Sequence, residues 1–511
     1  MPWRSLGRAV RAVRPGDRVV LLPGVYREGD IGIERSGTKD APITFSAGPG
    51  AILSGGMQLT RWTRVEGNIY RSAPVDMAPF EAGRKRPTIL FEDGKFLNRD
   101  HGEKLETMKP GSCVWLNDER CWLVWCRAGD DPSAHQIELP CLSDGIVVAK
   151  GVRHLVFEGL DMRYYNGTAL RVAAGSGDLV FRDCRFGDST RRLLRIEGDH
   201  VLVERCRFEQ TGSTGLGFAG RDAFAGIVRD CVAVQCGNCY YANGRAHDIL
   251  FERCEASHFA RRAIPHFDFK ADGDAVGLGV CSNVTVRACV LRDSGWQAYA
   301  QNNRVIVWGK KKRRVRPNDG HAFDIWRGEA YRIESNIVAR CAGGVLIAPG
   351  TAGAIVANTI VDVRGHGIAA HGSAKAPVKG VRIDGNTVVD CRSGVWLSKV
   401  TTDARVINNI LAGNEIALSV QNAEGFFEDR NAFFGTNRAG LISWLGKAGD
   451  LARYREQSRM GTNSVQADPR FVAPQTGDYR LRADSPCRAR RTDGGDLGSR
   501  PWRPVPRLAA N

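Results

Sequence analysis

The sequence predicts an all-β fold, a right-handed parallel β-helix, from three observations. A phrase of alternating apolar and polar residues that ends in Cys or Asn recurs ten times up to residue 431. Seven of the nine intervals between these endings span 22 to 28 residues. Turn residues separate the phrases, in keeping with 59 Gly among 511 residues. A strand, turn, strand unit of this length leaves no room for a helix and must stack on its neighbours to bury its apolar face.

The residues that end the phrases are expected to stack at one corner of the coil. The series is Cys184, Cys206, Cys231, Cys254, Cys289, Asn336, Asn358, Asn386, Asn409 and Asn431. Asn side chains in register can form a ladder of amide hydrogen bonds, and Cys is a small buried substitute that needs no strong partner. Side chains that point in parallel rarely reach the disulfide dihedral angle. We therefore predict free thiols, and we treat the single C-x-x-C at Cys236 and Cys239 as a weak metal signal.

The rhythm of the repeat divides the chain into four regions. Residues 1–56 would form an N-terminal cap and the first coils, beginning with a short helix over the open end of the coil. Residues 57–140, rich in Trp and turn signals, would form a β-rich insertion. Residues 141–435 would form the parallel β-helix of ten or more coils, with long loops at 255–335. Residues 436–511 would form an irregular C-terminal segment.

Composition restricts the class of protein and of partner. The hydrophobic content of 43% and the charged content of 25% are those of a globular protein. The apolar runs are too short to span a membrane. With 72 Lys and Arg against 56 Asp and Glu, the net charge of +16 favours a polyanionic partner. We expect an acidic polysaccharide rather than nucleic acid as that partner, and a monomer.

The two ends of the chain resemble known carbohydrate-active proteins. The opening PGDRVVLLPGVYRE…GTKDAPITFSAGPGAILSGG resembles the first coils of polysaccharide lyase family 6, the alginate lyase and chondroitinase B type. The closing DPRFVAPQTGDYRLRADSPCRA resembles a tail shared by many bacterial carbohydrate-active β-helix proteins. The resemblance implies an extracellular or periplasmic enzyme, although residues 1–14 lack the apolar segment of a signal peptide, so that either the protein is not exported or the signal is missing from this sequence.

The site is predicted where the coils carry extra residues. The two long intervals, 254→289 and 289→336, are adjacent, so the added chain lies at one level of the β-helix. The first interval contains HFARRAIPHFDFKADGD, and the second contains WQAYAQNNR, KKKRRVR and NDGHAFDIWRG. On a strand, HFDFK would place His266, Asp268 and Lys270 on one face.

These residues fit a polysaccharide lyase. Cleavage of a uronate glycan by β-elimination needs a neutralised carboxylate, a base for the proton beside it and an acid for the leaving oxygen. The predicted catalytic residues are Lys270 as the base, His266 or Tyr299 as the acid, Arg245 for the carboxylate, and His321. The predicted substrate-binding residues are Arg261, Arg262, Trp296, Lys310, Lys311, Lys312, Arg313, Trp326 and Arg327. Asp268, Asp272 and Asp274 are predicted ligands of a Ca²⁺ ion, which would share in neutralising the carboxylate.

Two other functions remain open at this point. A glycoside hydrolase would use two of Asp268, Asp272, Asp274 and Asp324 as acid and base. A non-catalytic protein would hold a polyanion with the basic run 310–316 and the two tryptophans. The sequence also departs from family 6, because the family's Asn-Lys-Ser stretch is absent and Arg245 followed by Lys270 is a rearranged version of its Arg and Lys. Gly365-His366-Gly367 resembles the G-H-G of pectin-hydrolase β-helix enzymes, whose remaining motifs are not matched.

Overall fold

A computed structural model describes residues 3–81, 89–99, 105–259, 273–294, 305–308, 311–314, 320–351, 353–435, 440–500 and 505. The described residues fall into two compact units, 3–226 with 231–240, and 227–230 with 241–259 and 273–505. Both units consist of parallel β-helix coils, about 15 turns in all, which confirms the predicted fold class. Among the described residues, no helix has the length and apolar character needed to cross a membrane.

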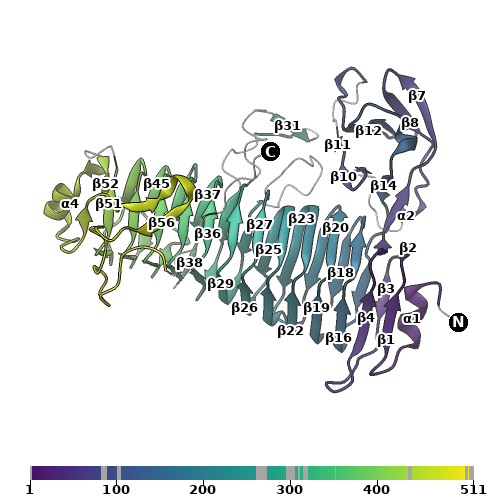
Figure 1. Cartoon of the computed structure of the whole chain (residues 1–511), viewed down its shortest axis with the longest axis horizontal. Coiled ribbons are helices and arrows are strands. Elements are labelled where there is room, and N and C mark those ends of the chain that lie inside the picture. Colours follow the sequence, from purple (N-terminus) through teal and green to yellow (C-terminus); the bar gives the residue numbers. More distant parts are fainter. Residues whose placement is uncertain are drawn as a thin grey trace. The chain divides into compact units, whose positions relative to one another are not determined.

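The first unit begins with the short helix that the sequence predicts. Helix α1 (Leu6–Ala12) is capped by Ser5, whose side chain accepts the backbone N–H of Arg8 at 3.3 Å. Its buried residues are Leu6, Ala9 and Val10, and it packs against strand β3 (Ile31–Ile33) (Figure 1). The helix therefore covers apolar surface of the first coil.

Parallel strands of the first unit stack in register. The strands of one ladder are β1 (Arg18–Leu21), β4 (Ile43–Ala47), β16 (Arg153–Glu158), β19 (Gly177–Arg182) and β22 (Asp199–Glu204). Phe45, Phe157 and Phe181 occupy one register position, with ring centroids 5.5 and 4.8 Å apart. Strand β16 pairs directly with β4, and β5 (Ala51–Ser54) and β15 (Ile146–Val148) also pair in parallel with coil strands, so the insertion lies between β5 and β15.

The insertion consists of two small sheets. One sheet has the order β11 (Asn98–Arg99), β12 (Ser112–Leu116), β13 (Cys121–Trp125), β8 (Ile69–Ser72), β7 (Trp62–Glu66). The other has the order β10 (Lys95–Phe96), β9 (Phe91–Glu92), β14 (Ile137–Pro140), β6 (Gly56–Gln58). Their shared core is apolar, and it contains the buried rings of Trp115 and Trp122 at 5.2 Å.

The second unit repeats the same strand pattern, and its coils differ from one another in length. One of its ladders is β26 (Ala246–Glu252), β29 (Cys281–Arg287), β35 (Arg332–Glu334), β39 (Ala354–Val356), β43 (Arg382–Asp384), β47 (Arg405–Ile407) and β50 (Phe427–Asp429). Ala246 pairs with Cys281, and Thr285 pairs with Arg332. These register steps equal the intervals 254→289 and 289→336 of the sequence repeat, so the repeat gives the coil lengths correctly.

A second ladder of this unit carries the candidate site. Its strands are β28 (Val276–Leu278), β33 (His321–Ile325), β37 (Gly343–Ile347), β41 (His366–Ala370), β45 (Ser393–Leu397) and β49 (Ile416–Val420), paired in parallel in this order. Figure 1 labels β37 and β45 of this ladder. The buried side chains of Phe323, Val345, Ile368, Val395 and Leu418 share one register position in the core.

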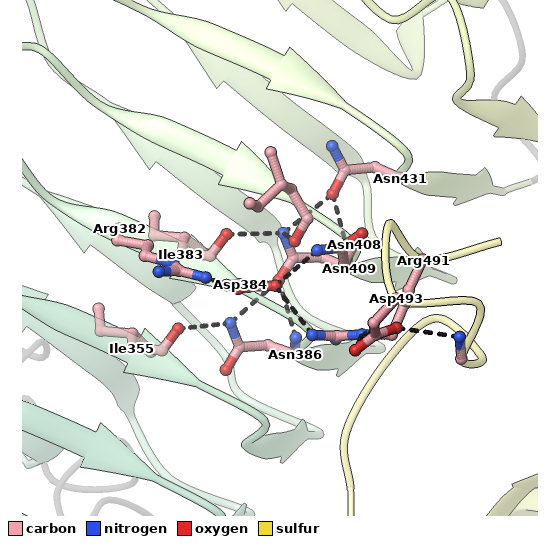
Figure 2. Close-up of polar contacts among 12 residues, drawn as sticks. Ile355, Arg382, Ile383, Asp384, Asn386, Asn408, Asn409, Asn431, Arg491 and Asp493 are labelled. Carbon is pink, nitrogen blue, oxygen red and sulfur yellow. Dashed lines mark hydrogen bonds and ion pairs between the residues drawn. The ribbon is translucent and has the colours of Figure 1, made fainter.

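The stack at the corner is present as predicted. All 15 cysteines are buried, and none of them forms a disulfide. In the first unit the backbone N–H of Cys206 donates to Cys231 Sγ at 3.4 Å. In the second unit the series ends in an amide ladder: Asn386 donates its backbone N–H and its Nδ2–H to Asn409 Oδ1, at 2.8 and 3.0 Å (Figure 2). Each Asn therefore satisfies buried groups of the adjacent coil.

Two segments are more regular than the sequence suggests. The C-terminal segment, expected to be irregular, contains helix α4 (Leu451–Ser458) and the antiparallel pair β55 (Phe471–Ala473) and β56 (Asp478–Leu481). Asp450 caps α4 by accepting the backbone N–H of Arg453 at 2.9 Å. The basic run, expected as a loop, contributes β32 (Lys311–Arg314), which pairs with β31 (Val305–Trp308). Local capping and pairing override the polar composition in both segments.

Candidate functional site

The structure describes part of the predicted site. Arg261, Arg262, His266, Asp268, Lys270, Asp272, Trp296, Tyr299 and Lys310 lie outside the described residues. Lys311, Lys312 and Arg313 lie on strand β32. The described predicted residues are Arg245, Asp274, His321, Trp326 and Arg327, all in the second unit.

Asp274 and His321 form a pair on adjacent coils. Asp274 precedes β28, and His321 begins β33, which pairs with β28. The buried carboxylate of Asp274 accepts the backbone N–H of His321 through Oδ1 at 3.1 Å, and the same oxygen lies 3.7 Å from His321 Nδ1. A carboxylate at this nitrogen orients the imidazole and stabilises its protonated form.

A glycine makes room for the His321 ring. His321 pairs with Gly343 on β37, and a Cβ at Gly343 would lie 2.1 Å from His321 Cδ2. The ring therefore extends over Gly343 toward the following coil. His366 begins β41, the strand that pairs with β37 one coil beyond Gly343. With coils about 4.8 Å apart, the backbones of the two histidines are separated by about 10 Å.

His366 belongs to a cluster of stacked rings. Its ring lies 5.0 Å from that of Trp396 at an interplanar angle of 14°, and the His371 ring lies 5.6 Å from Trp396 at 29°. Trp396 on β45 is half-buried and pairs with Ala369. We call Asp274, His321, His366, His371 and Trp396 the histidine–tryptophan cluster.

Within this cluster, the pKa of His366 departs from its ordinary value. Its Nδ1 is buried and makes no hydrogen bond to the described residues. Burial, reinforced by the positive charge of Arg392, lowers the pKa of His366 to about 4. The ring is therefore neutral at physiological pH. A perturbed, partly buried imidazole among aromatic and charged side chains is typical of functional sites.

The other described residues of the predicted site surround β33 or lie at a turn. Trp326 and Arg327 directly follow β33; Trp326 is 47% exposed, and the Arg327 guanidinium lies 4.7 Å from the centre of its ring. Asp324 lies on β33 itself. Arg245 is exposed at the turn before β26, where its backbone N–H donates to Val280 at 2.6 Å.

Sequence reasoning found one half of this cluster and missed the other. Asp274 and His321 were predicted as site residues, whereas His366, His371 and Trp396 lie beyond the long intervals on which the prediction rested. The triplet Gly365-His366-Gly367 was the available signal. Only the register of the coils shows that His366 follows His321 after two turns of 22 and 23 residues.

Comparisons with known proteins agree with this architecture. Residues 239–411 and 303–449 match the family model described as right handed beta helix region. A solved PL6 family alginate lyase aligns with a TM-score of 0.53 at 11% identity, covering 98% of this chain and 56% of that chain. A PL6 family polysaccharide lyase from Pseudopedobacter saltans aligns at 0.43 and 11%, covering 98% and 97%. A pectate lyase aligns at 0.40 and 13%, covering 97% and 90%.

The family-model match and the alignment with the PL6 family alginate lyase support the fold. The chain is a right-handed parallel β-helix protein, similar in fold to a PL6 family alginate lyase. No curated protein matches the sequence significantly.

Proposed function

We propose that the chain is a carbohydrate-active enzyme that cleaves an acidic, uronate-containing glycan by β-elimination, with His321 as the base. The observation that carries the proposal is the buried Asp274 carboxylate beside His321 Nδ1, at 3.7 Å, in a cluster that also presents a stacked tryptophan. A fold alone supports several chemistries, so the argument depends on these side chains.

The pair suits proton abstraction. To act as the base, His321 would carry its proton on Nδ1, beside Asp274, and its Nε2 lone pair would take the proton from C5 of the uronate. As the C5–H bond breaks, its electrons form the C4=C5 double bond, and the C4–O bond to the neighbouring sugar breaks. The leaving oxygen takes a proton from an acid. Asp274 stabilises the imidazolium that His321 becomes, as carboxylates do beside other catalytic histidines.

Charge and stacking supply the rest of the site in this proposal. The uronate carboxylate must be neutralised before C5–H becomes acidic, and Arg392, whose charge acts on His366, is our candidate for this role. Trp396 offers an aromatic surface for a pyranose ring. The net charge of +16 attracts a polyanionic chain at low ionic strength.

The predicted residues outside the described part keep their proposed roles. These are Lys270 as an alternative base, His266 or Tyr299 as the acid, and the lysines and arginines that would hold the polymer. Of the three proposed Ca²⁺ ligands only Asp274 is described, and its Oδ1 accepts the backbone N–H of His321. This contact fits an orienting role better than a metal-ligand role, so we derive no step through calcium.

A glycoside hydrolase remains the second candidate, with Asp274 and Asp324 as its described carboxylates. A hydrolase needs one carboxyl group that reaches the glycosidic oxygen. Asp274 is 2% exposed, which favours orientation of His321 over direct contact with a sugar.

The test is to incubate the full chain with alginate, polygalacturonate and chondroitin. A lyase produces unsaturated uronate ends that absorb in the ultraviolet. We expect this product from the wild type, and a loss of about 10²–10⁴-fold in kcat for His321→Ala, the range typical of a general base. Asp274→Asn should lower kcat with little change in KM and alter the pH profile, because it acts through His321.

The matched control is His247→Ala, which removes the histidine of another Asp–His pair in the same unit, Nδ1 to Asp248 Oδ2 at 2.7 Å. It should retain activity. New reducing ends without ultraviolet absorbance would identify a hydrolase and overturn the lyase proposal. Binding without either product would identify a non-catalytic polyanion-binding protein. Full activity of His321→Ala would place the base elsewhere.

A further inference from the structure

The insertion of the first unit brings together three donor groups of a kind that binds transition metals. Glu92 ends β9, Cys126 directly follows β13, and His135 lies two residues before β14. One carboxylate oxygen, the thiol sulfur and one imidazole nitrogen all lie within 4.8 Å of one another. The three residues come from separate elements and converge only in the folded insertion.

Regular backbone structure holds these donors in place. Asp93 and Gly94 connect β9 to β10 with φ values of +49° and +73°, which is the left-handed geometry of a tight two-residue hairpin. Ile137 of β14 pairs with Glu92 of β9. The short 3₁₀ helix η2 (Pro132–Ala134) returns the chain from Cys126 to His135. The donors are therefore positioned by strand pairing and a turn rather than by long flexible loops.

Two more carboxylates complete the arrangement around His135. Asp93 Oδ2 lies 2.7 Å from His135 Nδ1, and Glu92 Oε1 lies 4.0 Å from the same nitrogen. On the other side of the ring, Asp130 Oδ1 lies 2.8 Å from Nε2. A histidine that directs one nitrogen to a cluster of donors and the other to a carboxylate has the arrangement of a metal ligand, in which the outer carboxylate fixes the tautomer and orientation of the ring.

The burial of Cys126 and Glu92 and the charges around them also favour a metal site. Cys126 is fully buried and its thiol makes no hydrogen bond to the described residues, while Glu92 is 2% exposed. The backbone N–H of Arg127 donates to both Glu92 oxygens, at 3.0 and 3.2 Å, and its side-chain Nε lies 3.7 Å from Oε2. With a metal bound, the Cys126 thiolate and the carboxylates of Glu92 and Asp93 would carry three negative charges. A divalent cation and Arg127 would balance them at a site whose Glu92 and Cys126 donors are buried and whose Asp93 is exposed.

We propose that Glu92, Asp93, Cys126 and His135 bind one Zn²⁺ ion, with Asp130 as the outer partner of His135. Sulfur, imidazole nitrogen and carboxylate oxygen together suit four-coordinate zinc, whereas Ca²⁺ and Mg²⁺ take oxygen ligands. The ion would tie the β9–β10 turn to the ends of β13 and β14. Its role is structural, because four protein ligands leave no open position for a substrate.

The test uses the full chain, dialysed against buffer after loading with zinc and analysed by elemental mass spectrometry. We expect one equivalent of zinc in the wild type and none in Cys126→Ala or His135→Ala. Asp130→Asn should weaken zinc binding by about 10–100-fold, the usual effect of removing an outer carboxylate. Cys113→Ala is the matched control, because Cys113 is equally buried in the same apolar cluster; it should keep one equivalent.

A spectroscopic measurement keeps the test independent of the stability of the variants. Co²⁺ bound to the wild type should give thiolate-to-metal charge-transfer absorption and the intense visible bands of tetrahedral cobalt. Wild type that retains no zinc would overturn the proposal. So would bound cobalt without a thiolate band, or zinc that Cys126→Ala retains as tightly as Cys113→Ala.

Discussion

The backbone N–H of Cys289 donates a hydrogen bond to Asn336 Oδ1 at 2.9 Å, at the point where the corner stack of the second unit changes from thiols to amides. Before this point the acceptor is sulfur, as in the 3.4 Å contact from the N–H of Cys254 to Cys289 Sγ. After it, each Asn oxygen accepts two N–H groups. The corner therefore becomes more strongly hydrogen-bonded toward the C-terminal coils.

The first prediction concerns the stability that the amide ladder adds compared with the stacked thiols. Asn386 accepts two N–H groups of Asn358. It donates to Ile355 and Asn409 (Figure 2). Asn386→Ala leaves these buried groups unsatisfied and should lower the free energy of unfolding by about 3 kcal/mol or more, because each such group costs about 1–3 kcal/mol.

The comparison variant is Cys289→Ala, which removes one weak sulfur acceptor and should cost about 1 kcal/mol. Urea unfolding followed by circular dichroism measures both. Equal losses in the two variants would show that the amide ladder adds no stability beyond that of the stacked thiols.

A second prediction concerns the contact of the C-terminal segment with β43. The Arg491 guanidinium lies 3.6 Å from Asp384 Oδ1 and also near Asp493 (Figure 2). Gly385, with φ of +65°, leaves the space that Arg491 occupies: a Cβ there would be 2.3 Å from Nη1. Arg491→Ala should speed hydrogen exchange in residues 485–500 and leave β43 protected, since Asp384 keeps Arg382 and Asn408 as partners.

Arg490→Ala is the control for this contact, because the exposed Arg490 donates only to the nearby carbonyl of Pro486, at 2.7 Å, among its described side-chain contacts. Its exchange pattern should match that of the wild type. Unchanged exchange at residues 485–500 in Arg491→Ala would mean that the apolar contacts of Tyr479, Cys487 and Leu497 hold the segment alone.

The third prediction is a pH dependence of stability. Burial raises the pKa of Glu428 from 4.5 to about 7, although Asn431 and Ser464 donate to it. The folded state thus holds a proton that the unfolded state releases at lower pH, so stability falls as pH rises from about 4.5 to about 7. The loss approaches about 3 kcal/mol above that window.

Glu428→Gln should remove this fall and be the more stable protein at about pH 8, where the wild-type carboxyl is charged and buried. Denaturant unfolding at about pH 5 and about pH 8 provides the measurement. The exposed Glu415→Gln serves as the control. A wild-type stability that rises over the same window, with Glu428→Gln following it, would contradict the assigned cause.

The fourth prediction concerns the space that Gly343 leaves for His321. Gly343→Ala places a methyl group 2.1 Å from the original position of His321 Cδ2 and must displace the ring. If His321 is the base, we expect a loss of about 10²-fold in kcat, the usual cost of a displacement near 1 Å. Gly48→Ala, whose added Cβ would have its nearest neighbour at 3.9 Å, is the control. Unchanged kcat in Gly343→Ala would separate His321 from the reaction.

The sequence predicted the coils well because their evidence is local. The alternation of apolar and polar residues and the recurring Cys or Asn specify one strand at a time, and the intervals between them equal the register steps of the structure. The site was predicted less completely. Asp274 and His321 lie within the two long intervals, but His366 and Trp396 lie in coils of ordinary length and carry no comparable signal.

By itself, the sequence determined that this chain stacks its strands in parallel, since no unit of about 22 residues can bury its own apolar face. It also determined where the thiols and amides line up, because one residue in each coil repeats. Only the tertiary structure decided that His321 lies over Gly343, that His366 stacks on Trp396, and that Glu92, Cys126 and His135 converge. These contacts depend on side-chain direction and on pairing between segments of unequal length, which the sequence pattern does not encode.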